Sequence, residues 1–190
     1  MTIVDLDGTL VDCNSFTEFV KFLFKRCPAA RFPLIKIVVC RKLRIISHHA
    51  AKERIISFAA DLLSTTDIKE FVEFLCSRIN PKVKEIITGA EGVCLATAAP
   101  EIYVSAFASE VNIPRFNATR QGGEENKGKH KLDNLLNSGI IFDENTIVIT
   151  DHRDDLPLLK ANCRGVNYIV NPSHRSLEAL RQEGIRFEII

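Results

Sequence analysis

Three short apolar segments of this sequence each lead into side chains that can do chemistry. Those side chains are Asp5, Asp7 and Thr9 after the first segment, Thr97 after the second, and Asp151, Asp154 and Asp155 after the third. Three lysines, Lys127, Lys129 and Lys131, precede the third segment. If the segments are parallel strands of one sheet, these groups meet at the edge where open α/β folds bind their ligands.

The mixture of groups indicates which chemistry the edge would do. Carboxylates crowded together repel and resist ionisation, and a divalent cation relieves that repulsion. Mg²⁺ takes one or two protein carboxylates, several waters and a substrate phosphate. A lysine can neutralise the remaining phosphate charge, and a threonine hydroxyl can donate to a phosphate oxygen. The set therefore predicts phosphoryl transfer, in which positioning and charge neutralisation supply most of the catalysis.

The elements that must position these groups alternate along the chain. Near-continuous apolar runs predict strands covered on both faces at residues 1–6, 92–96, 146–150, 165–170 and 185–190. Helical patterns lie at residues 100–109, 129–136, 156–161 and 173–183, the last with Ser173 as N-cap and Gly184 as stop. This alternation predicts an α/β fold with a Rossmann-like, doubly wound parallel sheet.

One long segment departs from the alternation. Residues 13–88 show no clear strand and several helix faces, such as Phe16, Phe19 and Leu23. That length far exceeds what a crossover between parallel strands needs. We therefore expect a helical cap at 13–88, inserted into an α/β core made of residues 1–12 and 89–190.

Composition narrows the class of protein. The chain has 190 residues, 46% of them apolar and 26% charged, with a formal net charge of +1. This balance argues against disorder and against a nucleic-acid partner. The six cysteines show no CxxC spacing, so no zinc site is indicated, and most lie in apolar runs typical of reduced thiols. The first residues are unlike a signal peptide, so a cytoplasmic location is expected.

Basic residues gather in the predicted cap. Residues 21–54 contain ten Lys or Arg and one acid, Glu53. The favoured interpretation is a helix with one buried and one solvated face. Two alternatives stay open: the basic face attracts an anionic substrate, or it rests on a membrane surface. It does not span a bilayer, because Lys36, Arg41, Lys42 and Arg44 interrupt the apolar run.

Four motifs in this order resemble those of the haloacid dehalogenase superfamily. Residues 5–10, Asp-Leu-Asp-Gly-Thr-Leu, resemble its first motif, and residues 95–97, Leu-Ala-Thr, its second. Lys131 resembles the third motif and residues 151–156 the fourth. A helical cap between the first and second motifs is similar to the subfamily that contains phosphoserine phosphatases. The resemblance implies a Mg²⁺-dependent phosphatase acting on a small phosphorylated metabolite.

The resemblance also implies roles for individual residues. Asp5 would attack phosphorus and form an aspartyl-phosphate, and Asp7 would protonate the leaving group and then activate water. Thr97 and Lys131 would hold the phosphoryl group and offset charge. The substrate-binding set would be Gly8, Thr9, Ala98 and Asn14. The metal set would be Asp5, the carbonyl of Asp7, Asp151 and, directly or through water, Asp155.

The third and fourth motifs need separate comment. Among the three lysines, Lys131 fits the family pattern, because Gly128 precedes it by three residues and Leu135 follows it by four; Lys127 is the second choice. The fourth motif has Thr150 where the family usually has glycine. His152 stands where a small residue is common, and it either touches substrate or packs beside the loop.

Two features bear on substrate and on competing functions. Asn14 occupies the place where phosphoserine phosphatases carry a glutamate for the substrate amino group, although Asp12 or Glu18 could substitute.

A phosphotransferase or mutase would use the same covalent intermediate. A signalling module of the receiver type also places acids, a threonine and a lysine at strand ends, but it has neither the Asp5–Asp7 spacing nor a large cap. The sequence leaves the substrate and the oligomeric state open.

Overall fold

A computed structural model describes residues 1–190. Its centre is one six-stranded sheet in which every pair of neighbours is parallel, in the order β3-β2-β1-β4-β5-β6. The strands are β1 (Thr2–Val4), β2 (Val93–Pro100), β3 (Arg115–Thr119), β4 (Ile147–Thr150), β5 (Val166–Ile169) and β6 (Glu188–Ile189). The predicted fold class, a doubly wound parallel α/β sheet, is confirmed.

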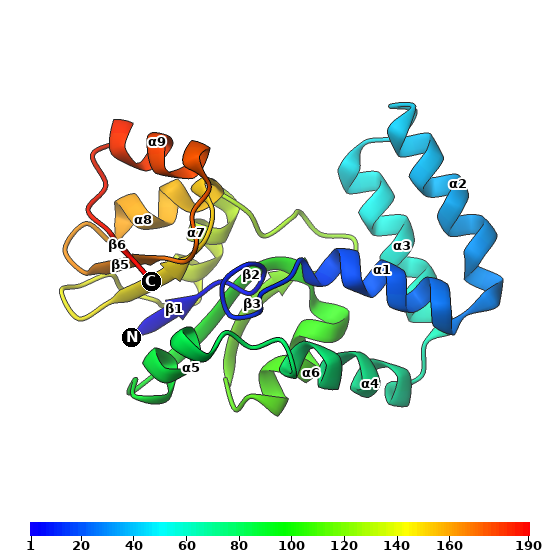
Figure 1. Cartoon of the computed structure of the whole chain (residues 1–190), viewed down its shortest axis with the longest axis horizontal. Helices are drawn as coiled ribbons and strands as arrows, with labels where there is room; N and C mark the ends of the chain where they lie inside the picture. The colour runs from blue at the N-terminus through cyan, green and yellow to red at the C-terminus, as the bar shows by residue number, and fades with distance from the viewer.

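The helices fall into an inserted group and a group that alternates with strands (Figure 1). The inserted group is α1 (Ser15–Arg26), the short 3₁₀ turn η1 (Pro28–Ala30), α2 (Arg31–Lys42), α3 (His48–Leu62), α4 (Thr65–Cys76) and α5 (Pro81–Thr88). The second group is α6 (Glu101–Glu110), α7 (Lys129–Asn137), η2 (Arg153–Asp155), α8 (Leu156–Ala161) and α9 (His174–Gln182).

The sheet is covered on both faces because its strands are apolar at consecutive positions. Successive side chains of a strand point to opposite faces. Accordingly, Val4 belongs to a core of 25 buried residues that includes α6, whereas Ile3 belongs to a second core of 10 buried residues with α7, α8 and α9. The near-continuous apolar runs of the sequence reflect this double burial.

The strand order reverses at β1. The chain runs outward from β1 through β2 to β3, and then returns to place β4 on the other side of β1. Val4 of β1 lies beside Ile149 of β4, so the residues that follow these two strands emerge next to each other. Such a switch point is where open α/β sheets bind ligands.

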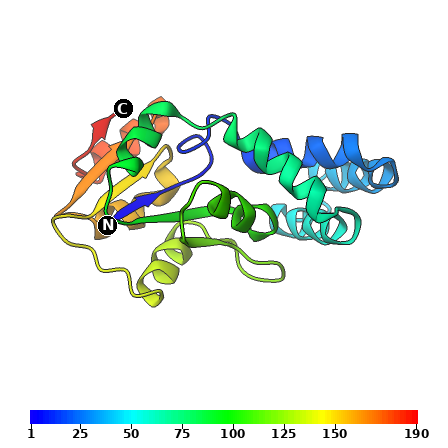
Figure 2. The same cartoon turned by 90° about the horizontal axis from the view of Figure 1, so that it is seen from below.

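Helices α1 to α4 extend from one end of the sheet, whereas α5 lies back beside it, as Figure 2 shows. Side-chain caps start several of the inserted helices. Asn14 caps α1 by accepting from the Thr17 N–H, and Ser47 caps α3 by accepting from Ala50. Ser64 and Asp67 form a reciprocal capping box at α4. These caps satisfy N–H groups that a helix start otherwise leaves unpaired.

The inserted helices and the sheet share one apolar core. Phe19 of α1 and Phe71 of α4 both pack on Tyr103 of α6, with ring centroids 4.9 and 5.1 Å away. The same buried cluster runs from Val4 and Leu95 in the sheet to Ile55 in α3. The division into a core and a cap at residues 13–88 stays a prediction, because packing is continuous across it.

One strand was absent from the sequence prediction. Arg115–Thr119 forms β3 at the edge of the sheet, beside β2. Its residues are polar or only half-buried up to Thr119, so they lack the apolar run that marks the other strands. None of the helices combines the length and the apolar character needed to cross a bilayer.

Candidate active site

The turn after β1 holds the first pair of acids. The Asp5 N–H donates to the Ile149 carbonyl at 2.9 Å, which extends the pairing with β4, and the Asp5 carbonyl accepts from the Leu10 N–H at 3.2 Å. The chain then reverses through Gly8, whose φ is +68°. Glycine adopts this left-handed conformation without the penalty that other residues incur.

Gly8 also lets Asp151 approach the turn. A Cβ built on Gly8 would overlap the Asp151 carboxylate. The carboxylate that follows β4 therefore occupies the space that a side chain at position 8 would fill. Asp5 and Asp151, 146 residues apart in the sequence, are brought to one spot by adjacent strands and by the missing Cβ.

If Mg²⁺ binds beside Asp5 and Asp151, Gly8→Ala should weaken that binding by at least about tenfold, because the new methyl displaces Asp151. The matched control is Gly122→Ala, at φ +72° with no atom near the added Cβ, which carries the backbone strain without a clash. Activity titrated against Mg²⁺ in both variants measures the difference. Equal Mg²⁺ affinity in the two variants would contradict the placement of Asp151.

Lys131 is buried between two carboxylates. Its Nζ lies 3.2 Å from Asp5 Oδ1 and 2.8 Å from Asp155 Oδ1, and the side chain is 3% exposed. Thr150 Oγ1 donates to Asp155 Oδ2 at 2.7 Å, so Thr150, which replaces the usual glycine, helps to fix Asp155. The fixed Asp155 in turn holds the Lys131 ammonium against Asp5.

The other two lysines of this segment lie elsewhere. Lys127 pairs with Asp154 at 2.7 Å on the rim, and both side chains are partly exposed. Lys129 is exposed at the start of α7. Of the three candidates, the geometry favours Lys131. His152 is also on the rim, where it pairs with Asp154 at 2.9 Å.

Asp7 faces the same space and is oriented by the inserted helices. Its Oδ1 accepts a 2.8 Å hydrogen bond from the Ser15 N–H at the start of α1. The Ser15 hydroxyl lies 2.9 Å from the Tyr103 hydroxyl, inside the aromatic core. The acid expected to move a proton is thus held by an element of the predicted cap, which is itself anchored on α6.

The end of β2 is held in the site mainly by hydrogen bonds to its backbone carbonyl groups. Thr97 is buried and its Oγ1 accepts from the Ala99 N–H at 3.1 Å, while its carbonyl accepts from Asn126 Nδ2 at 3.0 Å. The Ala98 carbonyl accepts from Lys52 Nζ and from Thr119 Oγ1, each at 2.7 Å. These bonds fix the strand end beside the two acids.

These groups surround a cavity of about 660 Å³. Its walls include eight of the ten residues singled out from the sequence: Asp5, Asp7, Gly8, Asn14, Ala98, Lys131, Asp151 and Asp155. Thr9 and Thr97 are buried and do not line it. From the opposite side, α3 contributes Lys52, which is almost fully buried and paired with Glu125.

The cavity holds several buried carboxyl groups and few cations, so the pKa values of Asp5, Asp7 and Asp151 are raised. Burial raises the pKa of Asp5 to about 7, against a lowering by Lys131. Burial likewise raises the pKa of Asp151 to about 6. The pKa of Asp7 is also raised by burial, and its hydrogen bonds with Ser15 oppose the rise. The pKa of Lys131 is raised, because Asp155 and Asp5 outweigh its burial.

The donor set fits a hard divalent cation with few protein ligands. No group of three or more His, Cys, Asp or Glu side chains is arranged to enclose a metal. Mg²⁺ needs fewer protein ligands than such an enclosing group, since it retains waters and takes one or two carboxylates. Asp155 is already engaged by Lys131 and Thr150, which leaves Asp5, Asp151 and the Asp7 carbonyl as candidate ligands. The raised pKa values of Asp5 and Asp151 are what a cation would reverse.

Several residues of the site escaped the sequence analysis. Lys52 and Glu125 carry no motif, and only the fold brings them together. Ser15 follows an N-cap residue, which could have marked its N–H as a donor free to bind a carboxylate. Thr150 was noted as a departure, but its bond to Asp155 follows only from the geometry.

The acids proposed to replace the missing glutamate at position 14 are engaged elsewhere. Asn14 Oδ1 accepts from the Thr17 N–H at 2.8 Å as the helix cap. Glu18 pairs with Lys21 and does not line the cavity. Asp12 lies at the rim and pairs with Arg78. The cavity therefore has no free acid dedicated to a substrate amino group.

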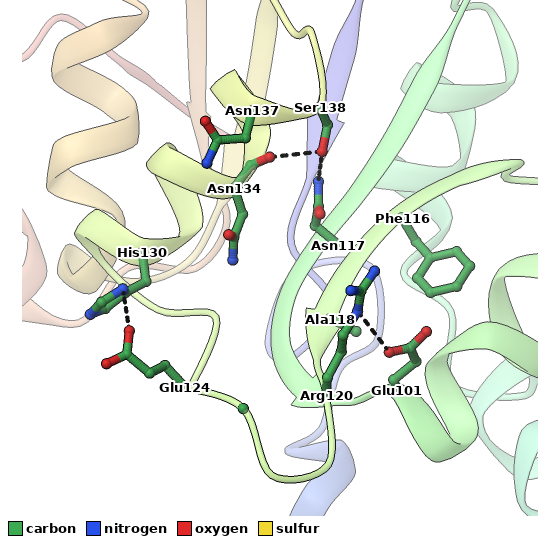
Figure 3. Close-up of a pocket in the computed structure, with 11 residues that line it drawn as sticks. Glu101, Phe116, Asn117, Ala118, Arg120, Glu124, His130, Asn134, Asn137 and Ser138 are labelled. Carbon is green, nitrogen blue, oxygen red and sulfur yellow. Dashed lines mark hydrogen bonds and ion pairs between the residues drawn. The ribbon is translucent and has the colours of Figure 1, made fainter.

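A second hollow of about 400 Å³ lies between β3 and α7 (Figure 3). It is lined mainly by polar side chains, among them Asn117 and Asn134, and its rim carries the pairs His130–Glu124 and Arg120–Glu101. None of the expected catalytic residues contributes to it. It is separate from the acids at the switch point.

The chain thus combines a parallel α/β core, acids at the switch point and helices inserted after β1. Residues 2–160 match the family described as haloacid dehalogenase-like hydrolase, so the chain belongs to that family and is an enzyme of the hydrolase class. The resemblance seen in the motifs is confirmed. No curated protein matches the chain in sequence.

Solved structures share the fold at low sequence identity. A protein of unknown function from Bordetella pertussis Tohama I is 17% identical, with a TM-score of 0.76 over 98% of this chain and 96% of that chain. A phosphoserine phosphohydrolase-like protein from Francisella tularensis is 17% identical, with a TM-score of 0.56 over 96% and 98%. A substrate-bound phosphoserine phosphatase is 14% identical, with a TM-score of 0.57 over 97% of both chains. The chain therefore has the fold of phosphoserine phosphatases.

Proposed function

We propose that this enzyme is a Mg²⁺-dependent phosphatase that hydrolyses a small organic phosphate monoester through an aspartyl-phosphate on Asp5. The observation that carries the proposal is the buried contact of Lys131 with Asp5, at 3.2 Å, in a cavity that Asp7 also lines. A nucleophile, a proton donor and a cation are thereby directed at one space. The cavity volume of about 660 Å³ suits a small metabolite.

In the first step, an Asp5 carboxylate oxygen attacks phosphorus while the bond from phosphorus to the ester oxygen breaks. The leaving oxygen takes a proton from Asp7, whose pKa is raised by burial. In the second step, Asp7 takes a proton from water as the water oxygen attacks phosphorus. This step releases inorganic phosphate and restores the Asp5 carboxylate.

Other groups position the phosphoryl oxygens. The Lys131 ammonium donates to Asp5 Oδ1 and would offset negative charge as it develops. Ala98 and the turn at Gly8 border the phosphoryl group, the buried Thr9 and Thr97 lie behind them, and Asn14 bounds the leaving-group side. Asp5, the Asp7 carbonyl and Asp151 would hold Mg²⁺, with Asp155 contributing through water. Bound Mg²⁺ would supply the positive charge that favours ionised carboxylates and a neutralised phosphate.

The substrate we favour is a phosphate ester without a free amino group beside the phosphate. Phosphoserine needs a carboxylate partner for its ammonium, and Asn14, Asp12 and Glu18 do not provide a free one. Lys52 instead supplies a buried ammonium on the cap side of the cavity, at present neutralised by Glu125.

The direct test is hydrolysis of p-nitrophenyl phosphate by the purified chain with Mg²⁺. We expect turnover that excess EDTA removes and Mg²⁺ restores, followed by selectivity in a panel of sugar, nucleotide, amino-acid and lipid phosphates. Full activity in EDTA would contradict the metal requirement. Added alcohols distinguish the outcomes, because a phosphotransferase would convert them to phosphate esters and a phosphatase would release inorganic phosphate.

Without Mg²⁺, the protein is expected to be more stable at about pH 5 than at about pH 8. Asp5 and Asp151 have folded-state pKa values of about 7 and about 6, against an ordinary 3.8. In this window the folded state therefore binds more protons than the unfolded state, so stability rises as pH falls. Thermal melts in EDTA measure the trend. Mg²⁺ should raise the melting temperature most at about pH 8, and Asp5→Asn should flatten the dependence; a melting temperature that rises with pH would contradict this.

A further inference from the structure

The outward side of α2 exposes large apolar side chains. Phe32, Ile35 and Val39 follow a three- and four-residue spacing and are 78%, 52% and 46% exposed. The opposite side of the same helix buries Leu34 and Ile37 in the shared core. Leu43 and Ile45 continue the exposed run beyond the helix end. We call these five exposed residues the outer cap face.

This exposure is concentrated, not scattered. Seven of the fourteen large apolar side chains exposed on the whole chain fall between Phe24 and Ile45. The other seven are distributed over the rest of the molecule, with only Phe58 and Leu62 one turn apart on α3, which is ordinary for a protein surface. In Figure 1, α2 lies at the far end of the molecule from the sheet, with α3 along its inner side. A gathered apolar surface marks an interaction site.

The outer cap face is surrounded by unpaired positive charge. The exposed cations are Arg31, Lys36, Arg41, Lys42 and Arg44, and none of them forms an ion pair with an acid. From Phe19 to Lys52 the chain has nine basic residues and no acid. On the helix, Lys36 and Lys42 flank the apolar stripe. The favoured sequence interpretation, a helix with a buried apolar face and a solvated polar face, accounts for Leu34 and Ile37 but not for this stripe.

Apolar side chains bordered by lysine and arginine suit one partner best. An anionic bilayer surface accepts the apolar side chains below its headgroups and the cations among them. A second copy of this chain would bring two sets of unpaired like charges together. The 12-residue α2 is about 18 Å long, too short to span a bilayer but suited to lying in its interface.

We propose that the outer cap face docks this protein on the surface of anionic lipid membranes. The proposal goes beyond the proposed phosphatase activity and does not depend on it. Docking has a consequence for the cavity: α2 packs on α3, and α3 carries His48 and Lys52 of the cavity wall. The cap-side wall of the cavity then lies one helix away from the bilayer.

Sedimentation with lipid vesicles tests the docking of the full chain. We expect the protein to bind vesicles of phosphatidylcholine mixed with phosphatidylglycerol, and not vesicles of phosphatidylcholine alone. High salt should release it, because the screening length falls to about 3 Å at 1 M. Failure to bind the mixed vesicles, or binding to both kinds that salt leaves unchanged, would overturn the proposal.

Matched variants locate the contact. The double variant Phe32→Ser, Ile35→Ser should bind mixed vesicles at least tenfold more weakly, whereas Ile141→Ser, which removes an apolar side chain that is also 78% exposed, should bind like the wild type. Lys42→Gln should weaken binding about fivefold and the exposed Lys69→Gln should not.

Two further measurements separate docking from its alternatives. All four variants should keep the wild-type melting temperature and the wild-type rate on p-nitrophenyl phosphate, since none of these residues lines the cavity. Light scattering should find the wild-type chain monomeric without lipid. A dimer that Phe32→Ser, Ile35→Ser dissolves, or equal loss of binding in the Ile141 control, would assign the outer cap face to another role.

Discussion

Asp5→Asn is expected to abolish phosphatase activity while the protein stays folded. The asparagine amide cannot form the covalent intermediate, so kcat should fall on the order of 10⁴-fold or more. Burial raises the pKa of Asp5 to about 7, so this carboxylate is costly to ionise in the folded protein, and removing it should not lower the melting temperature near neutral pH. Steady-state kinetics and thermal melts measure the two effects.

The control for Asp5→Asn is Asp12→Asn. Asp12 lines the same cavity but is 59% exposed and paired with Arg78. A surface pair of this kind contributes little, so its loss should change kcat by no more than a few fold. Wild-type turnover in Asp5→Asn would remove the basis of the proposed mechanism, and a similar loss in both variants would point to a general effect of charge.

Lys131→Met should abolish activity and also destabilise the fold. Lys131 is buried against Asp5 and Asp155, and its removal leaves two buried carboxylates without their cation. Breaking such a buried pair on one side costs about 3–5 kcal/mol. Denaturant unfolding measures the loss of stability, and kinetics with p-nitrophenyl phosphate measure the loss of turnover.

Two companion variants distinguish catalysis from folding. Lys127→Met removes a half-exposed partner of Asp154 on the rim, and it should leave both stability and rate close to wild type. Lys131→Met combined with Asp155→Asn removes one of the two stranded acids, so it should recover part of the stability but none of the activity. Recovery of activity in the double variant would show that Lys131 only supports the fold.

The sequence predicted the parts of the fold that rest on local pattern. Doubly buried strands such as Ile147–Thr150 are apolar at successive positions, and a helix start such as Asn14 or Ser173 carries its own cap. The polar edge strand Arg115–Thr119 has no such signal, because only one of its sides is paired. It became visible only through its pairing with β2.

The residues of the site also separate into those with a local sequence pattern and those without one. Asp5, Asp7 and Asp151 belong to motifs, and strand adjacency brings them together as expected. Lys52, Glu125 and Tyr103 reach the site from elements separated by tens of residues, and they carry no local pattern. Likewise the run from Arg31 to Lys42 has apolar residues on two sides, and sequence alone does not tell which side is buried.

The aromatic contact of Phe19, Phe71 and Tyr103 limits how the enzyme can open between turnovers. A rigid-body movement of α1 and α4 away from α6 would separate these rings and expose the apolar core to solvent. The contacts between α3 and the loop after β3 are polar instead. There, Lys52 holds Glu125, and Glu53 accepts from the Gly122 N–H at 2.8 Å. The aromatic cluster therefore fixes the inserted helices on the core, and we expect any opening to occur at these polar contacts.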